Sequence, residues 1–354
     1  MTDFENKNNT TGWFRKTGPE FDVVISTRVR LARNLSGYLF PGVIEKDDED
    51  KVQDVVKKAF SAINSSDDFT VLKLKELTPT ERKMLLERNI ISQDYSLQTE
   101  RFLIIGKEKN IFTTINEIDH LRISSITGGL DLQKAYETVN SLDNLLEQHL
   151  DYAVSLDLGY LNTEITNIGT GMRSSVMLHL PALVKTQLID KAFKAVMQIG
   201  LRVKGFFGDD EHSLGNMYQI SNQISLGISE KEINEKLENI TLQIVNYERK
   251  ARKELLEKGK VDLEDEVFRA YGVLKHCKSL SSKEAIEFLS ALRMGIAMGL
   301  IELPIEEINA AIFLTQKAHM QQLINSQEIG ADIKLIDYTR SNFVKKCLEE
   351  SSKV

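Results

Sequence analysis

The C-terminal third of the chain carries only helical patterns, and this feature constrains the fold most. Ser229 with Glu232, and Ser281 with Glu284, have the spacing of capping boxes that begin helices. From Ser229 to about residue 258, apolar side chains recur on one helical stripe. No later segment shows the alternation that is typical of a strand. The sequence therefore predicts a helical C-terminal region that follows a domain of a different kind.

The first two thirds of the chain alternate between strand and helix patterns. Alternating or continuous apolar runs predict strands, and apolar residues at helical spacing predict the helices between them. The predicted strands cover residues 22–34, 69–77, 101–115 as a hairpin, 201–207 and 216–226. The predicted helices cover residues 45–63, 79–89, 131–150 and 181–199. A mixed domain of strands and helices is therefore expected before the helical region.

Length and charge narrow the class of protein. A chain of 354 residues can bury a full core, and its length favours two domains. The net charge of −7 argues against nucleic acid or an anionic membrane surface as a partner. Two cysteines, Cys277 and Cys347, are too few for a disulfide framework and lack metal-site spacing. Residues 1–11 are polar and no apolar run reaches about 18 residues, so we expect a cytoplasmic protein.

A glycine-rich turn precedes one arginine of interest. Residues 167–171 form an Asn-Ile-Gly-Thr-Gly turn, and Arg173 follows it directly. Glycines on both sides of Thr170 would let the backbone approach a ligand, and an arginine there can bind phosphate with its planar guanidinium. A tight connection without a ligand is the alternative interpretation.

Two further groups of polar residues are candidates for chemistry. Arg28 and Arg30 share one face of a predicted strand because side chains alternate, so they form either an anion-binding wall or a solvated edge. Residues 116–122 place two carboxylates, an imidazole and a guanidinium at the end of another strand. That cluster fits a hydrogen-bonded loop end as well as a site, and His120 fits a structural donor better than a catalyst. The sequence contains neither a Walker A motif nor G-x-G-x-x-G, which leaves a P-loop or Rossmann interpretation without support.

Four motifs in order resemble the ATP:guanidino phosphotransferases, or phosphagen kinases. They are S-T-R-V-R-L-A-R-N from Ser26, N-E-x-D-H-L-R from Asn116, G-Y-L-x-x-x-x-T-N-x-G-T-G-x-R-x-S-V from Gly159, and G-x-x-x-x-x-x-G-N-x-Y-Q-I-S-N-Q from Gly208. The resemblance covers roughly residues 18–300 and is greatest to the bacterial protein-arginine kinases. It implies an α+β fold, with an antiparallel sheet flanked by helices and an all-helical C-terminal domain. We accordingly assign a flexible arm to residues 1–20, the catalytic domain to 21–258 and a dimerisation domain to 259–354.

The resemblance also implies a nucleotide site for ATP with Mg²⁺, without a metal site made by the protein itself. Phosphoryl transfer depends mainly on positioning and on neutralising the charge of the transferred group, which arginines and magnesium supply. The positions that correspond to the family's nucleotide-binding residues come from four segments. They are Ser26, Thr27, Arg28, Val29, Arg30, Arg122, Arg173, Ser174, Ser175, Val176, Met177, Lys204, Gly205 and Gly208.

The acceptor side departs from the family pattern. A guanidinium has a pKa above about 12 and must lose a proton to attack phosphorus. The family uses two glutamates and a cysteine for this, whereas this chain has Ile118, Asp209 and Glu164 at the corresponding positions. On the nucleotide side a family arginine is Lys204, which cannot make a bidentate contact, and a family histidine is Asn89.

These departures leave two hypotheses. In the first, carboxylates are redistributed, so that Glu117, Asp119, Glu164 and Asp209 serve the acceptor and kinase activity is retained or retuned. In the second, the chain is a pseudokinase that binds nucleotide as an adaptor, because losing a general base lowers the rate by about a hundred- to ten-thousandfold.

The resemblance implies partners as well. They are protein substrates with exposed arginine, a zinc-binding activator protein, components of the Clp protease system, and a second copy of the chain in a homodimer. A phosphoarginine pocket of the family is only partly matched, by Asp337 and Arg340. A free guanidino metabolite stays open as an alternative acceptor.

Overall fold

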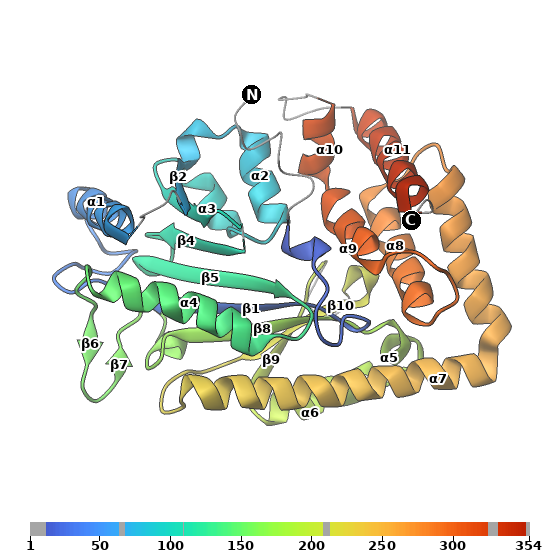
Figure 1. Cartoon of the computed structure of the whole chain (residues 1–354), viewed down its shortest axis with the longest axis horizontal. Helices are drawn as coiled ribbons and strands as arrows, with labels where there is room; N and C mark the ends of the chain where they lie inside the picture. The colour runs from blue at the N-terminus through green and yellow to red at the C-terminus, as the bar shows by residue number, and fades with distance from the viewer. Residues whose placement is uncertain (1–11, 64–67, 109, 208–212, 325–331, 352–354) are drawn as a thin grey trace.

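The computed structural model describes residues 12–63, 68–108, 110–207, 213–324 and 332–351. An eight-stranded antiparallel sheet crosses the molecule, and helices cover both of its faces (Figure 1). The strands in spatial order are β2 (Phe69–Lys73), β3 (Phe102–Gly106), β4 (Ile111–Ile115), β5 (Leu121–Gly128), β1 (Val24–Arg33), β8 (Met172–His179), β10 (Met217–Asn222) and β9 (Leu201–Gly205). A separate hairpin pairs β6 (Val154–Ser155) with β7 (Gly159–Tyr160). The fold class expected from the resemblance, α+β with an antiparallel sheet, is confirmed.

One face of the sheet is apolar and packs against long helices. Val29, Leu31, Ile123 and Val176 point into a core that is completed by α1 (Lys46–Ile63), α4 (Leu132–Glu147) and the first half of α7 (Glu230–His276). The short helices α5 (Pro181–Lys185) and α6 (Ile189–Gln198) cover the β9 end of this face. One helix over residues 181–199 was predicted, but the chain turns between α5 and α6, where Gln187 has a positive φ of 58°.

The C-terminal region is helical, as its patterns predicted. It contains the second half of α7, α8 (Ser282–Ala297), α9 (Ile305–Leu314), α10 (Lys317–Leu323) and α11 (Ile333–Ser351). Helix α7 runs under the sheet and then bends away into this region (Figure 1), with non-helical angles at Gly259. Ser229 and Ser281 make the capping boxes that their spacing predicted.

Buried polar contacts join the C-terminal helices to the sheet domain. Arg293 of α8 donates to the carbonyls of Phe21 and Asp22, at 2.7 and 3.1 Å, and to Nδ1 of His179, at 2.9 Å. A second core lies between α8, α9, α11 and α2 (Pro79–Glu87), α3 (Gln93–Leu97). The two regions therefore pack as one body, because each closes a core that the other begins.

The N-terminal segment differs from the loose arm predicted over residues 1–20. Trp13 and Phe14, in the 3-10 helix η1 (Trp13–Arg15), are only 3% and 2% exposed and contact Phe313 of α9. Aromatic burial therefore anchors residues 13–15, and residues 1–11 lie outside the described residues. The remaining 3-10 helices are η2 (Leu74–Glu76), η3 (Ile165–Asn167) and η4 (Leu214–Asn216).

Candidate active site

Arginines from three adjacent strands share one face of the sheet. Arg30 of β1 lies directly opposite Arg173 of β8 and Ser124 of β5. Arg122 of β5 lies opposite Ala32, two residues along β1 from Arg30. Residues opposite each other in an antiparallel pair share a face, so Arg28, Arg30, Arg122 and Arg173 all lie on the side away from the apolar core. The alternation in the sequence predicted this common face for Arg28 and Arg30.

A cavity of about 100 Å³ lies over these arginines. Its lining comes from β1, β4, β5, the turn between β4 and β5, and the segment between α2 and α3. The lining residues are Arg28, Arg30, Asn89, Ile90, Ile91, Ser92, Thr114, Glu117, Arg122 and Ser124. The Asn89 carbonyl accepts from Nη1 of Arg28 at 2.8 Å, although Asn89 itself has a left-handed φ of 59°. Asparagine tolerates this conformation better than most residues, which lets α2 end at the cavity.

The arginines repel one another at close range. Burial and the neighbouring Arg122 lower the pKa of Arg28 to about 9, against the opposing effect of Glu117. Burial, Arg122, Arg28 and Arg173 together hold the pKa of Arg30 well below its usual value. In the described part of the chain, Nε of Arg28, Arg30 and Arg173 finds no hydrogen-bond acceptor. An anion in this place would satisfy buried donors and remove repulsion at once.

Glu117 is the carboxylate that balances this charge. It lies 2.9 Å from Nη1 of Arg122 and accepts a 2.6 Å hydrogen bond from the Thr114 hydroxyl. Burial alone would raise the pKa of Glu117, but Arg122, the hydroxyls of Ser92 and Thr114, and Arg28 outweigh it and keep the pKa below its usual value. Glu117 is therefore held as an anion against the arginines.

Arg173 extends the cationic face toward β9. Burial and repulsion from Arg202 and Arg122 lower its pKa, while Glu164 opposes the shift. Arg202 lies opposite Ser221, whose hydroxyl is 3.4 Å from Nη2 of Arg173. Lys204, two residues along β9, shares this face, and both β9 side chains are exposed. Arg202 was not among the predicted site residues, although its alternation with Lys204 in L-R-V-K-G indicates a shared face.

Several predicted nucleotide residues are turned away from the arginines. Thr27 donates to the carbonyl of Gly129 at 2.7 Å, and Ser174 donates to Asn234 of α7 at 2.7 Å. Val29 and Val176 belong to the apolar core. The structure does not bring these four side chains to the cavity, because period-two alternation places them on the opposite face. Ser26, Ser175 and Met177 share the face of Arg28, whereas Gly205 ends β9 and Gly208 lies outside the described residues.

The predicted acceptor carboxylates separate into different environments. Asp119 is buried, and its Oδ1 accepts from Nδ2 of Asn34 and from the amide of Thr163, both at 2.7 Å. The structure does not place Asp119 in the lining of the cavity, because these contacts commit it to joining two loops. Glu164 is exposed at the start of η3, within electrostatic reach of Arg173, and Asp209 lies outside the described residues. Ile118, at the family's glutamate position, is 38% exposed.

His120 has the structural role that the sequence favoured. Its Nδ1 accepts from the amide of Leu35 at 3.0 Å, so the Nε2–H donates to the carbonyl of Leu39 at 3.1 Å. Burial lowers the pKa of His120 to about 4, which keeps the ring neutral.

The turn at residues 167–171 approaches protein backbone instead of a cavity lined by arginines. A Cβ on Gly169 would lie 2.6 Å from the carbonyl oxygen of Ser225, and one on Gly171 would lie 2.5 Å from that of Ala32. Both glycines have positive φ, 111° and 65°. The tight-connection interpretation therefore accounts for both glycines.

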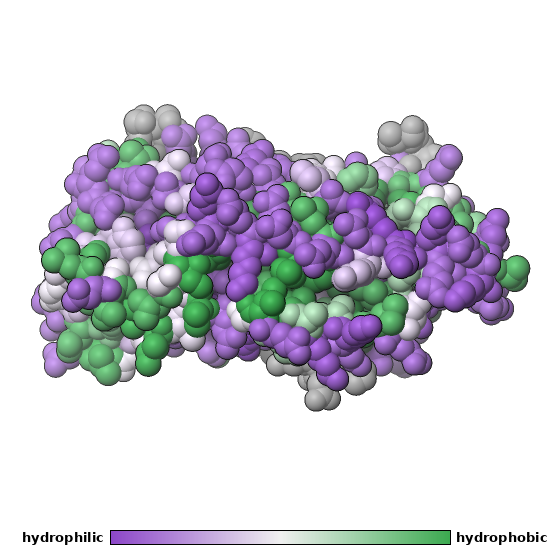
Figure 2. Space-filling model, turned by 90° about the horizontal axis from the view of Figure 1, so that it is seen from below, coloured by the Kyte–Doolittle hydropathy of each residue, from purple (hydrophilic) through white to green (hydrophobic). Residues whose placement is uncertain are grey.

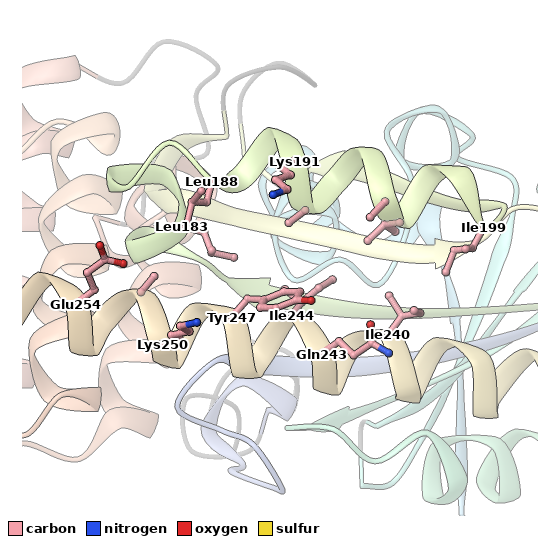
Figure 3. A pocket seen from close by; sticks show the side chains of 14 residues that line it. Leu183, Leu188, Lys191, Ile199, Ile240, Gln243, Ile244, Tyr247, Lys250 and Glu254 are labelled. Atoms are coloured by element: carbon pink, nitrogen blue, oxygen red, sulfur yellow. The ribbon is translucent and has the colours of Figure 1, made fainter.

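A larger cavity, of about 540 Å³, lies in the helical layer over the apolar face (Figure 3). It is formed by α5, α6 and α7, and most of its lining is apolar, including Leu188, Ile240 and Ile244. Figure 2 shows apolar side chains gathered on this side of the molecule. The charged side chains among its described lining residues are Lys191, Lys250 and Glu254, and the lining has no arginine. Because the rest of the lining is mostly apolar, this cavity fits a triphosphate less well than the arginine cavity does.

Comparisons with known proteins agree with this geometry. Residues 51–251 match the family described as ATP:guanido phosphotransferase, C-terminal catalytic domain. Residues 260–354 match the Protein-arginine kinase McsB C-terminal domain. The chain belongs to the ATP:guanido phosphotransferase family. It is a guanidino kinase, and the resemblance noted in the sequence is confirmed.

Curated relatives of this family match over nearly the whole chain. A protein-arginine kinase of Caldanaerobacter subterraneus is 39% identical over 330 residues, which are 92% of this chain and 98% of the relative. One of Geobacillus sp. is 40% identical over 325 residues, which are 90% of each chain.

Solved phosphagen kinases share the fold. The duplicated taurocyamine kinase of Schistosoma mansoni aligns with a TM-score of 0.59 and 25% identity over 68% of this chain and 34% of that one. Lombricine kinase aligns with a TM-score of 0.57 over 71% of both chains, and at 24% identity it indicates the fold alone.

The described residues contain no group of three or more His, Cys, Asp or Glu that could hold a metal ion. No described helix combines the length and apolarity needed to cross a membrane.

Proposed function

We propose that this chain transfers the γ-phosphoryl group of ATP to arginine side chains of proteins. The observation that carries the proposal is the cationic face, in which Arg28, Arg30, Arg122 and Arg173 converge from β1, β5 and β8. The Nε donors of Arg28, Arg30 and Arg173 are unsatisfied among the described residues. The relatives named protein-arginine kinases, and the C-terminal match over residues 260–354, support a protein acceptor.

In this proposal the arginines bind the triphosphate and neutralise the charge that develops during transfer. Arg28, Arg30 and Arg122 line the cavity and hold the phosphates, while Arg173, Arg202 and Lys204 extend the contact along β8 and β9. Glu117 limits the repulsion among these groups and keeps Arg122 in place. Magnesium arrives with the nucleotide as part of the substrate, because Mg²⁺ commonly binds phosphates with only one or two protein carboxylates.

The acceptor guanidinium would lie on the Glu164 side of Arg173. One of its nitrogens loses a proton to the Glu164 carboxylate and forms a bond to the γ-phosphorus, and the bond from that phosphorus to the ADP oxygen breaks. Glu164 supplies negative charge that orients the acceptor. The resemblance assigns the same role to Asp209, which is one methylene shorter than the family's glutamate and lies outside the described residues. Because positioning contributes much of this catalysis, a relocated carboxylate can support turnover.

A nucleotide-binding adaptor without catalysis is the second candidate function, and one observation favours it. Ile118, which is half-exposed and apolar, stands where the family has a catalytic glutamate. Loss of that base predicts a rate reduction of roughly a hundred- to ten-thousandfold unless Glu164 substitutes for it.

The test is phosphoarginine formation on an arginine-rich protein, detected as acid-labile phosphate, with Glu164→Gln compared to wild type. The kinase proposal predicts labelling that requires ATP and Mg²⁺ and falls at least tenfold in Glu164→Gln. Glu147→Gln, which changes a carboxylate that hydrogen-bonds Tyr160, is the control and should label normally. ATP binding without labelling of any arginine would identify the adaptor instead.

We also propose a homodimer formed through the C-terminal helices. Apolar side chains on α7 and α11 are exposed there, including Val261, Phe268 and Tyr338 at 77%, 52% and 51%. A zinc-binding activator protein, Clp protease components and a cytoplasmic location remain predictions from the resemblance. Light scattering on Phe268→Glu would test the dimer, since a charge in that contact should yield monomers.

A further inference from the structure

A series of buried, hydrogen-bonded residues, which we call the relay, connects the C-terminal helices to the arginine cavity. It begins at His319 in α10, passes through Glu87 and Arg88 at the end of α2, and reaches Asn89, whose carbonyl holds Arg28. The partners are 231 residues apart in sequence, and His319 is 4% exposed.

His319 bonds both of the residues that end α2. The Arg88 Nε can only donate, so its 2.9 Å contact makes Nε2 of His319 the acceptor. The Nδ1–H of His319 therefore donates to Oε2 of Glu87 at 2.7 Å. The ring is thus a neutral tautomer in which one nitrogen serves the carboxylate and the other serves the guanidinium.

Glu87 reinforces the joint from the opposite direction. Helix α10 has no side-chain cap of its own, and Glu87 accepts from the amides of Ala318 and His319 at 2.7 and 3.2 Å. A carboxylate at these free amides is stabilised by hydrogen bonds and by the helix dipole. The end of α2 and the start of α10 therefore form one unit.

The segment that this unit positions is part of the arginine cavity. Residues 89–92 follow α2 directly and line the cavity, and Ser92 contributes a hydroxyl to Glu117. Trp13 fixes the same turn by donating to the Arg88 carbonyl at 3.2 Å. Because Arg28 donates to the Asn89 carbonyl, a displacement of the α2 end would redirect a phosphate-binding guanidinium.

We infer that His319 is a positioning residue for nucleotide binding, through which the C-terminal helices set the geometry of Arg28. This inference rests on the proposed nucleotide role of the arginine cavity. Among the described residues, none of the C-terminal helices lines the cavity. A change that weakens the packing of α10 against α2 would nevertheless lower ATP affinity.

The experiment compares His319→Leu, which removes both ring contacts, with His319→Gln, whose amide can accept and donate. ATP affinity is measured by calorimetry on the full chain, together with KM for a protein acceptor. We expect His319→Leu to weaken ATP binding roughly tenfold, on the scale of a lost hydrogen bond to a charged group. His319→Gln should recover most of the affinity, and KM for the acceptor should change less than about twofold in both variants.

Asn309→Leu is the matched control. Asn309 is a buried polar residue of the same helical region, and it accepts at 2.7 Å from Arg293, which belongs to α8 and not to α2. It should lower the melting temperature and leave ATP affinity unchanged. Should His319→Leu fail to fold, Arg88→Met removes the same bond from the other side and should weaken ATP binding similarly.

The two proposals fail in distinguishable ways. If Arg28→Gln weakens ATP binding but neither His319→Leu nor Arg88→Met does, the relay is wrong and the nucleotide site stands. If Arg28→Gln leaves ATP binding unchanged, the nucleotide site itself is wrong. If Asn309→Leu and His319→Leu lower ATP affinity equally, the loss comes from lower stability of the C-terminal helices, and His319 has no specific positioning role.

Discussion

Replacing Glu117 by glutamine should destabilise the ligand-free protein and increase the stabilisation that ATP provides. The Glu117 side chain is 6% exposed and pairs with Arg122 at 2.9 Å, beside Arg28 and Arg30. Removing one partner of a buried ion pair costs about 3–5 kcal/mol, and glutamine preserves the shape and the hydroxyl contacts, so we expect the lower end. For cooperative unfolding of a chain of this size, about 3 kcal/mol corresponds to a melting temperature lower by roughly 4 °C.

ATP should reverse this loss, because the triphosphate supplies the negative charge that the variant lacks. The assay is thermal unfolding of wild type and Glu117→Gln with and without saturating Mg-ATP. The variant's melting temperature should rise more with ATP than that of wild type. Glu266→Gln, which removes an exposed ion pair with Lys185, is the control. Its free energy of unfolding should change by less than about 1 kcal/mol, with or without ATP. A ligand-free variant as stable as wild type, or one that gains no more from ATP, would refute this account of Glu117.

Two other changes have defined outcomes. Ile118→Glu should raise the rate of phosphoarginine formation. The melting temperature should change little, because Ile118 is 38% exposed. A rate at or below that of wild type would mean that the acceptor site no longer has the family geometry. His120 should make the protein acid-sensitive: its pKa falls from 6.5 in the unfolded chain to about 4 when folded, so the unfolded state takes up the proton first as pH drops below 6.5. The loss approaches roughly 3 kcal/mol near pH 4, and urea unfolding of His120→Gln should show a flatter pH dependence than wild type between these values.

Local patterns predicted much of the fold and part of the candidate site. The alternation in β1 was enough to place Arg28 and Arg30 together, and the Ser-x-x-Glu spacing located the starts of α7 and α8. The same alternation also turns Thr27 and Val29 away from the cavity, which a match to a contiguous family motif could not reveal.

Contacts between residues far apart in the sequence could not be predicted from local patterns. Asp119 carried the residue type of a catalytic carboxylate, but its partners Asn34 and Thr163 belong to loops that only the fold brings together. The contact between Arg88 and His319 spans most of the chain, and no local periodicity encodes it. Alternation in L-R-V-K-G places Arg202 on the face of Lys204, but its proximity to Arg173 follows from the order of β8, β10 and β9.

The central claim is that the arginines of β1, β5 and β8 form the site for the triphosphate. Calorimetric titration of Mg-ATP into wild type and Arg30→Gln tests it most directly, since Arg30 lies between Arg173 and the β5 strand and has an unsatisfied Nε. The account predicts affinity lower by roughly 10- to 100-fold in Arg30→Gln and unchanged in Arg269→Gln, an exposed arginine of α7 paired with Asp265. Equal affinity for ATP in Arg30→Gln and wild type would contradict it.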